Sequence, residues 1–168
     1  MSTTDRSRSK PKLVLLDCDC PSPAACLDAM RDHQDRLLSL CDRLEKIADS
    51  LPIPVDTREC LDLANSLLPT IRIAHQFEEN RFYPAARVIT GSSDAIEEVI
   101  DRLCEEHHED ECFAEEITEA LGTLVNGSTA RDAEAIGYML RGFFGQLRRH
   151  VAFENDYLCT PVAKELQQ

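Results

Sequence analysis

The chain has 168 residues, of which 43% are hydrophobic and only 5% aromatic, with no tryptophan. That length and that apolar fraction argue against a disordered chain and suit one domain with a real core. The formal net charge of −13 argues against nucleic acid as a partner, because such a binder must neutralise phosphates with Lys and Arg.

The chain carries no segment with the length and apolarity of a signal peptide or a membrane span. We therefore expect a cytoplasmic protein with no membrane partner, whose eight cysteines stay reduced. Residues 1–21 are rich in Ser, Arg, Lys and Pro and are interpreted as a flexible N-terminal tail. Residues 22–168 then form the single folded domain.

Four helical patterns follow the tail, each with apolar residues at steps of three and four. Leu, Ala, Glu and Arg dominate the chain, and this composition favours helix over strand. The patterns cover residues 22–51, residues 56–89, residues 93–126, and residues from 128 nearly to the C-terminus.

Start and stop signals bound each of these patterns. The expected N-terminal caps are Ser22, Asp56, Ser93 or Asp94, and Ser128 or Thr129; the expected stops are Pro52, Gly91 and Gly127. Each pattern spans roughly 30 residues, or about 45 Å of helix. Short loops between long amphipathic helices make neighbours antiparallel, so we predict an all-α, up-down-up-down four-helix bundle.

Histidines and glutamates interrupt the apolar seams of all four patterns. The seams themselves include Leu61 in the second helix, Cys104 in the third and Tyr157 in the fourth. Every predicted helix places one histidine on its seam, and three helices add a glutamate four residues later. The interrupting residues are His33, His75 with Glu79, His107 with Glu111, and His150 with Glu154.

Residues four apart lie on one face of a helix, so each His/Glu pair can aim two donor atoms at one spot. A carboxylate in an apolar core is costly unless it is paired or binds a metal. Any one pair is more often structural than a metal site. Four of the chain's five histidines on seams, one per helix, favour a metal. Mixed imidazole and carboxylate ligands suit iron, manganese or zinc and exclude a soft thiolate site.

The chain also repeats itself. Asp32-His33 is followed 42 residues later by His75, and Glu106-His107 is followed 43 residues later by His150. Each second histidine opens the motif HxxxEN, with a tyrosine and a proline after it. Two related helix pairs would give a pseudo-two-fold bundle with a dinuclear site on its axis.

These residues resemble the hemerythrin HHE cation-binding family over roughly residues 25–165. The resemblance implies a non-heme centre of two iron ions, bridged by oxo or hydroxo, with Glu79 and Glu154 as bridging carboxylates. It carries over the ligand set His33, His75, Glu79, His107, His150 and Glu154.

Glu111 departs from the oxygen-carrying members of that family, which have a fifth histidine at this position. The helical register of Cys104, His107 and Glu111 favours Glu111 as a ligand, although the surrounding acidic segment also allows a surface position. An anionic ligand favours ferric iron over reversible oxygen binding. His107 and His108 are adjacent, so only one can face the core, and we expect it to be His107.

Three functions remain open on these residues. The first is a protein that binds or senses oxygen, nitric oxide or a peroxide, or handles iron, and passes a signal to an unidentified protein partner. The second is a di-iron enzyme of the peroxidase, nitric oxide reductase or ferroxidase type. The third is a metal-free structural bundle, which the buried carboxylates disfavour. The chain shows no nucleophile elbow, P-loop or CxxC motif, so binding is favoured over catalysis.

Overall fold

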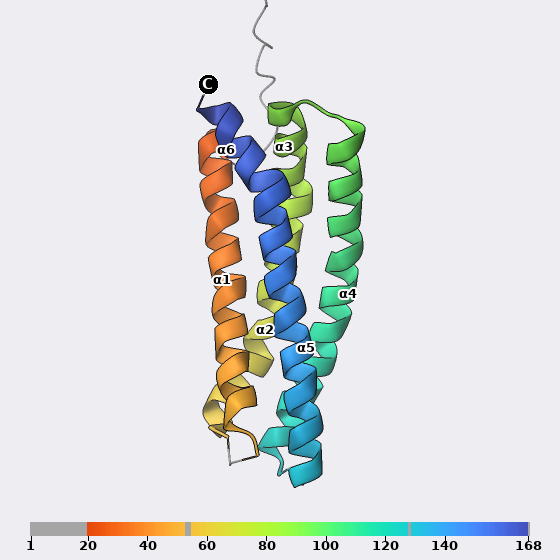
Figure 1. Cartoon of the computed structure of the whole chain (residues 1–168). Coiled ribbons are helices and arrows are strands. Elements are labelled where there is room, and N and C mark those ends of the chain that lie inside the picture. Colours follow the sequence, from red (N-terminus) through yellow and green to blue (C-terminus); the bar gives the residue numbers. More distant parts are fainter. Residues whose placement is uncertain (1–19, 53–54, 128, 168) are drawn as a thin grey trace, which may run out of the picture.

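The computed structural model describes residues 20–52, 55–127 and 129–167, and within them the chain is helical with no strand. Four helical rods lie side by side (Figure 1). The first is α1 (Pro23–Ser50), and the third is α4 (Asp94–Val125). The second is α2 (Thr57–Phe77), a π-helical turn η1 (Glu78–Phe82) and α3 (Tyr83–Thr90); the fourth is α5 (Ala130–Glu154), a π-helical turn η2 (Asn155–Cys159) and α6 (Thr160–Leu166).

Side-chain caps start the long helices where the sequence predicts them. Ser22 accepts a hydrogen bond from the backbone N–H of Ala25, and Asp56 accepts two at the start of α2. Ser93 caps α4, and Thr129 forms a reciprocal capping box with Asp132 at the start of α5. These bonds satisfy backbone donors that a helix start leaves without partners.

Successive rods run in opposite directions, so the predicted up-down-up-down bundle is confirmed (Figure 1). Helix α1 packs against α2 and α5, and α4 packs against the same two helices. Gly91, which ends the second rod, has a φ of 77°, a conformation that favours glycine. Within the part of the chain described here, each helix is too short or too polar to cross a lipid bilayer.

The core is divided into two apolar clusters. One runs along the half of the bundle that contains Leu44, Leu67, Leu121 and Phe143. A smaller cluster around Phe82 fills the other half and includes residues of α3 and α6. Along each rod, the buried polar residues lie between the members of the two clusters. A polar layer therefore crosses the middle of the bundle.

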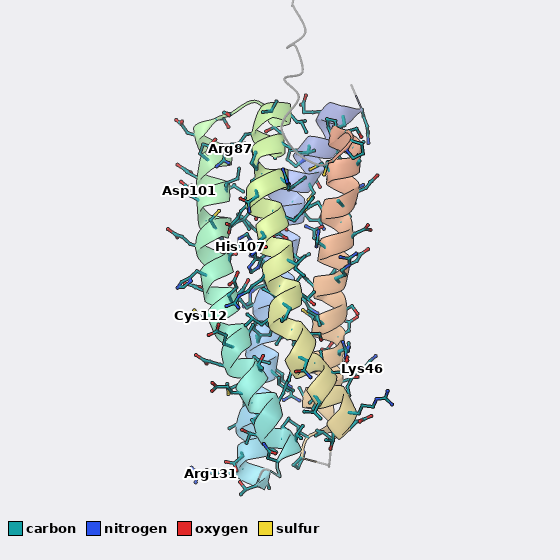
Figure 2. All side chains as sticks on the ribbon, turned by 180° about the vertical axis from the view of Figure 1, so that it is seen from behind. Lys46, Arg87, Asp101, His107, Cys112 and Arg131 are labelled. Carbon is teal, nitrogen blue, oxygen red and sulfur yellow. The ribbon has the colours of Figure 1, made fainter. Side chains whose placement is uncertain are left out.

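Three residues predicted on the seams lie at the surface instead. Leu61 is 46% exposed and Tyr157 is 52% exposed, while Cys104 is also exposed. Leu63 and Leu103 take the buried positions on α2 and α4. Steps of three and four fit the predicted and the observed buried positions equally well. Periodicity alone therefore did not separate the two. Figure 2 shows the outer face of α4 with Asp101 and Cys112.

The larger apolar cluster provides a direct test of this packing. Leu44 is fully buried, so Leu44→Ala should lower the free energy of unfolding by about 3 kcal/mol through lost burial and a cavity. Leu61→Ala, on the exposed side of α2, should change it by less than about 0.5 kcal/mol. Chemical denaturation of both variants measures the difference. Equal losses would contradict the burial assigned to the two leucines.

Candidate metal centre

Seven buried polar side chains form the layer between the two apolar clusters. All are at most 3% exposed, and they come from all four rods: Gln34, His75, Glu78, His107, Asp110, His150 and Glu154. The structure thus brings together four residues of the predicted set: His75, His107, His150 and Glu154. The other three predicted residues, His33, Glu79 and Glu111, lie outside this layer.

On the second rod, Glu78 faces the core and Glu79 does not. The side chain of Glu78 is fully buried, whereas that of Glu79 is 43% exposed. Residues three and four positions after His75 lie on the same face of a helix, so the spacing allowed either Glu78 or Glu79 to face the core. A π-helical turn, η1, begins at Glu78. The prediction that Glu79 faces the core is wrong.

On α4, Asp110 is buried in place of Glu111. Asp110 accepts a hydrogen bond from the amide of Gln146 (2.8 Å), which holds it inside the bundle. Glu111 is half-buried and pairs with Arg72 near the surface. The buried stripe runs through Leu103, His107, Asp110 and Ala114, which fits steps of three and four as well as the predicted stripe does. The predicted burial of Glu111 is therefore also wrong.

On α1, Gln34 faces the core, and His33 lies at the edge of the bundle. Gln34 is 3% exposed and donates a hydrogen bond to Oε2 of Glu154 (3.0 Å). The His33 ring lies 4.8 Å from the ring of Phe77, between their centroids, at the edge of the bundle. Helix α1 therefore brings a neutral amide, and not an imidazole, to the polar layer.

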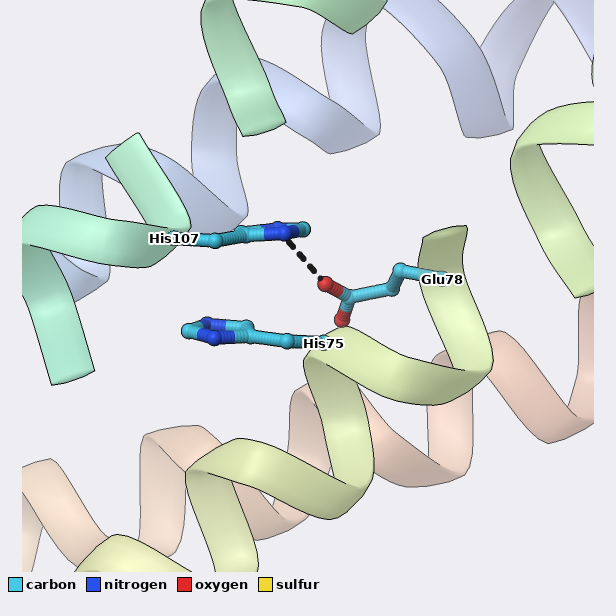
Figure 3. A group of neighbouring side chains, drawn as sticks. All are labelled: His75, Glu78 and His107. Carbon is cyan, nitrogen blue, oxygen red and sulfur yellow. Dashed lines mark ion pairs between the residues drawn. The ribbon is translucent and has the colours of Figure 1, made fainter. Parts of the chain in front are cut away.

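The inward atoms of this layer have few hydrogen-bond partners. Nε2 of His75, Nε2 of His150 and Oε1 of Glu78 are buried without one. The rings of His75 and His107 are stacked with centroids 3.9 Å apart, and Oε2 of Glu78 lies 3.0 Å from Nε2 of His107 (Figure 3). Buried polar atoms without partners are rare in folded proteins and call for an explanation such as a bound ion.

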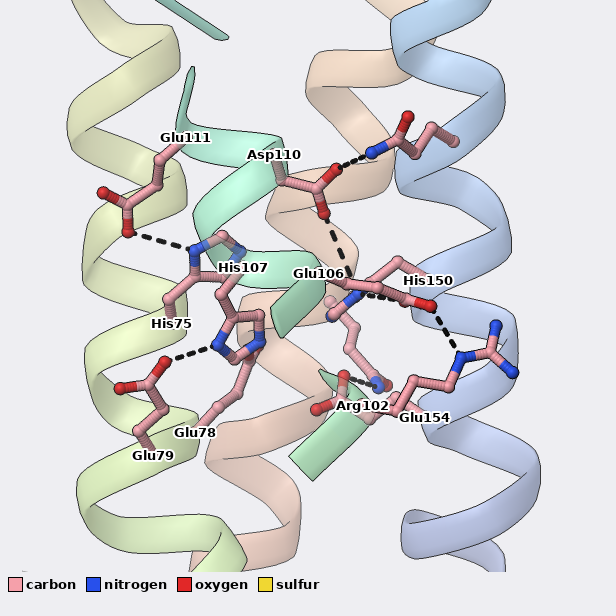
Figure 4. Close-up of polar contacts among 12 residues, drawn as sticks. His75, Glu78, Glu79, Arg102, Glu106, His107, Asp110, Glu111, His150 and Glu154 are labelled. Carbon is pink, nitrogen blue, oxygen red and sulfur yellow. Dashed lines mark hydrogen bonds and ion pairs between the residues drawn. The ribbon is translucent and has the colours of Figure 1, made fainter. Parts of the chain in front are cut away.

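The outward nitrogen atoms of the three histidines, by contrast, each contact a carboxylate (Figure 4). Nδ1 of His107 lies 2.7 Å from Glu79 Oε1, Nδ1 of His75 lies 3.2 Å from Glu111, and Nδ1 of His150 lies 3.1 Å from Glu106. A carboxylate on Nδ1 holds the proton there and leaves the Nε2 lone pair free to bind a metal. Glu79 and Glu111 thus act on ligand candidates from outside the layer.

Tyr83 brings a hydroxyl to the centre of the layer. It is 1% exposed, it donates a hydrogen bond to Oε1 of Glu154 (3.0 Å), and its oxygen lies 3.2 Å from Nε2 of His107. Burial, and then the nearby Glu154 carboxylate, raise the pKa of this phenol, so Tyr83 remains a donor. Together with Gln34, it engages both oxygens of Glu154.

Burial controls the charge of the layer in the absence of a cation. Burial, followed by the proximity of His107 and His150, lowers the pKa of His75 to about 2, and burial with the nearby His107 also lowers the pKa of His150. Burial opposes a charge on His107, but its contacts with Glu78 and Glu79 raise its pKa. Burial and the neighbouring Glu78 raise the pKa of Glu154. Neutral imidazole is the form that binds metals.

The inward donors form two groups that could each hold a cation. One consists of His75, Glu78 and His107, and the other of Glu78, His150 and Glu154; in each, the candidate ligand atoms lie within 4.8 Å of one another. Glu78 belongs to both groups. A carboxylate shared by two sets of donors could lie between two cations, and the unpartnered donors are compatible with such a pair.

Comparison with known families agrees with this geometry. The family model of the hemerythrin HHE cation binding domain matches residues 26–160, which include most of each of the four rods and the complete polar layer. The chain belongs to the hemerythrin HHE cation-binding domain family. No curated protein and no solved structure matches the chain. The predicted family is confirmed, and cation binding is the property that this hemerythrin-like domain shares with its family.

Glu78, Asp110 and Gln34 are the residues of the layer that sequence reasoning missed. The neighbouring pairs Glu78-Glu79 and Asp110-Glu111 were a signal that either carboxylate could face inward, but periodicity did not choose between the members of each pair. Gln34 follows His33 directly and carries no signal of its own.

The cost of burying Glu154 without a cation can be measured. Because the folded-state pKa of this carboxyl lies above its ordinary value of 4.5, the folded state favours the protonated form, and the stability of the metal-free protein should fall as pH rises above about 4.5. Glu154→Gln should therefore stabilise the metal-free protein at neutral pH by about 1–3 kcal/mol. Thermal denaturation in the presence of a chelator measures this change.

Glu109→Gln is the matched control, because Glu109 lies exposed on α4. It should leave the stability of the metal-free protein unchanged within about 0.5 kcal/mol. A metal-free Glu154→Gln protein that is less stable than wild type at neutral pH would show that the buried carboxylate is already compensated.

Proposed function

We propose that this hemerythrin-like protein binds two iron ions in its polar layer and uses them to bind a small ligand: oxygen, nitric oxide or a peroxide. The observation that carries the proposal is that the two ring nitrogens of the buried histidines have different hydrogen-bond surroundings. Nδ1 of each buried histidine contacts a carboxylate, while Nε2 of His75 and His150 is buried without a hydrogen-bond partner.

The proposed ligands are the inward donors of the two groups. His75 and His107 would hold one ion and His150 and Glu154 the other, with Glu78 between them. This assignment replaces Glu79 by Glu78 and leaves His33 and Glu111 outside the ligand set. Manganese or zinc would suit the same donors, and iron is preferred because mixed imidazole and carboxylate sites in helical bundles suit di-iron centres.

Iron bound here would supply a redox-active Lewis acid for a small molecule. The chain's own residues would hold it and exclude bulk water, since every inward residue is at most 3% exposed. Glu111 and Glu106 are in turn paired with Arg72 and Arg102, which fixes the orientation of His75 and His150.

The proposal is tested by iron content after expression in iron-supplemented medium. Wild-type protein should contain two iron ions per chain, because two ligand groups are present. Glu78→Gln should lose most of its iron from both groups, since its carboxylate is shared, whereas Glu79→Gln should retain most of it, with weaker binding of roughly tenfold or more from the lost contact with His107. Elemental analysis and circular dichroism measure metal content and folding together.

His108→Ala serves as a further control, because His108 is exposed on α4 and its loss should not change the iron content. Wild-type protein that folds normally and contains no metal would refute the function. A single zinc ion per chain would refute the dinuclear centre. Retention of iron by Glu78→Gln, with loss by Glu79→Gln, would return the ligand role to Glu79.

A further inference from the structure

The outer face of α4 carries a histidine and a cysteine that the polar layer does not use. His108 and Cys112 are both exposed, and Sγ of Cys112 lies 3.9 Å from Nε2 of His108. Cys112 is seen on the outer side of α4 in Figure 2. We propose that His108 and Cys112 form a separate surface metal site for zinc or a similar divalent cation that accepts both sulfur and nitrogen ligands.

The helix itself brings the two donor atoms together. Residues four apart lie on one face of a helix, and α4 is a continuous α-helix, without the π-helical turns that interrupt the second and fourth rods. His107 faces the core, so its neighbour His108, about 100° further round the helix, faces outward. The backbone of α4 therefore holds the imidazole of His108 beside the thiol of Cys112.

The distance between the two donor atoms suits a shared metal ion. With a Zn–S bond of about 2.3 Å and a Zn–N bond of about 2.1 Å, tetrahedral geometry separates the sulfur from the nitrogen by about 3.6 Å. In the structure, Sγ of Cys112 and Nε2 of His108 are 3.9 Å apart. A small side-chain rotation closes this difference, so α4 need not move to bind the cation.

The donors select the class of cation. Thiolate and imidazole both suit zinc, whereas magnesium and calcium prefer oxygen ligands. Zinc takes four ligands in most protein sites, and the exposed carboxylates of Glu109 and Glu116 lie about one turn before and after Cys112. These carboxylates or water complete the coordination. The ligands proposed for the polar layer include no cysteine, so the surface site differs from that layer in its chemistry.

The exposure of Cys112 sets it apart from most of the described cysteines. Four of them pack in the apolar clusters, where cysteine acts as a small apolar residue: Cys26, Cys41, Cys60 and Cys159. Cys104 and Cys112 are exposed on α4, four residues before and four residues after His108. The sulfur of Cys112 contacts the imidazole of His108, and this contact assigns Cys112 to the site. Cys104 is therefore its matched control.

The site is tested by alkylation of the full-length protein with iodoacetamide, with and without zinc. Peptide mass spectrometry gives the rate of reaction at each cysteine, so zinc bound elsewhere does not confuse the result. Zinc at ten times its dissociation constant should slow the alkylation of Cys112 by about tenfold, because the bound sulfur is no longer a free nucleophile. Zinc should leave the rate at Cys104 unchanged. In His108→Ala, zinc should slow Cys112 by less than about twofold, because one thiol alone binds the cation weakly.

Magnesium at the same concentration is the control for the acidic surroundings and should leave the rate at Cys112 unchanged. The inference is overturned if zinc fails to protect Cys112 in wild-type protein or protects Cys104 equally. It is also overturned if protection survives in His108→Ala or if magnesium protects as well as zinc does.

Zinc content separates this site from the polar layer. Zinc bound at the surface site should be lost from Cys112→Ser, a variant that changes none of the buried residues of the layer. Zinc that remains in Cys112→Ser is bound elsewhere. Absence of iron from wild-type protein would overturn the proposed function and leave the surface site untouched, since neither His108 nor Cys112 is among the ligands proposed for iron.

Discussion

The structure depends on how this helical core accommodates polar groups that water no longer solvates. Two carboxylates, Glu78 and Glu154, are fully buried beside three imidazoles, and unpaired charge in such surroundings is among the most costly features that a protein core can contain. Hydrogen bonds from Gln34 and Tyr83 offset part of the cost of burying Glu154. Glu78 has one close partner, Nε2 of His107, 3.0 Å from its Oε2, and a cation between the two groups would compensate both carboxylates.

A ring of carboxylates at the surface extends this layer outward. Glu79, Glu106 and Glu111 each contact a buried histidine. A carboxylate in this position makes an imidazole a stronger donor to a metal. The sequence argument expected Glu111 to favour ferric iron as a direct ligand. Through its contact with His75, Glu111 would act in the same direction on a bound metal, so the bias toward ferric iron stays a prediction although the predicted position of Glu111 was wrong.

Periodicity predicted the fold well and the site in part, for identifiable physical reasons. The caps and breakers are local signals, and they placed the helix starts at Ser22, Asp56 and Thr129. Which of two adjacent residues is buried does not depend on the local sequence alone. Glu78 faces inward where Nε2 of His107, on another helix, lies 3.0 Å from it, and Asp110 faces inward where Gln146 of another helix binds it. A choice of that kind depends on partners far along the chain, which a helical repeat does not encode.

The division of the core into two apolar clusters has a consequence for local unfolding. The polar layer separates the larger cluster from the smaller one, to which α3 and α6 contribute. Cooperative opening often follows the boundaries of such units, and we expect the smaller unit to open first because it buries fewer apolar side chains. Without a cation, we therefore expect amide hydrogens of α3 and α6 to exchange with solvent ahead of those around Leu44. Ions bound in the layer would join four rods at this boundary and make the two halves open as one.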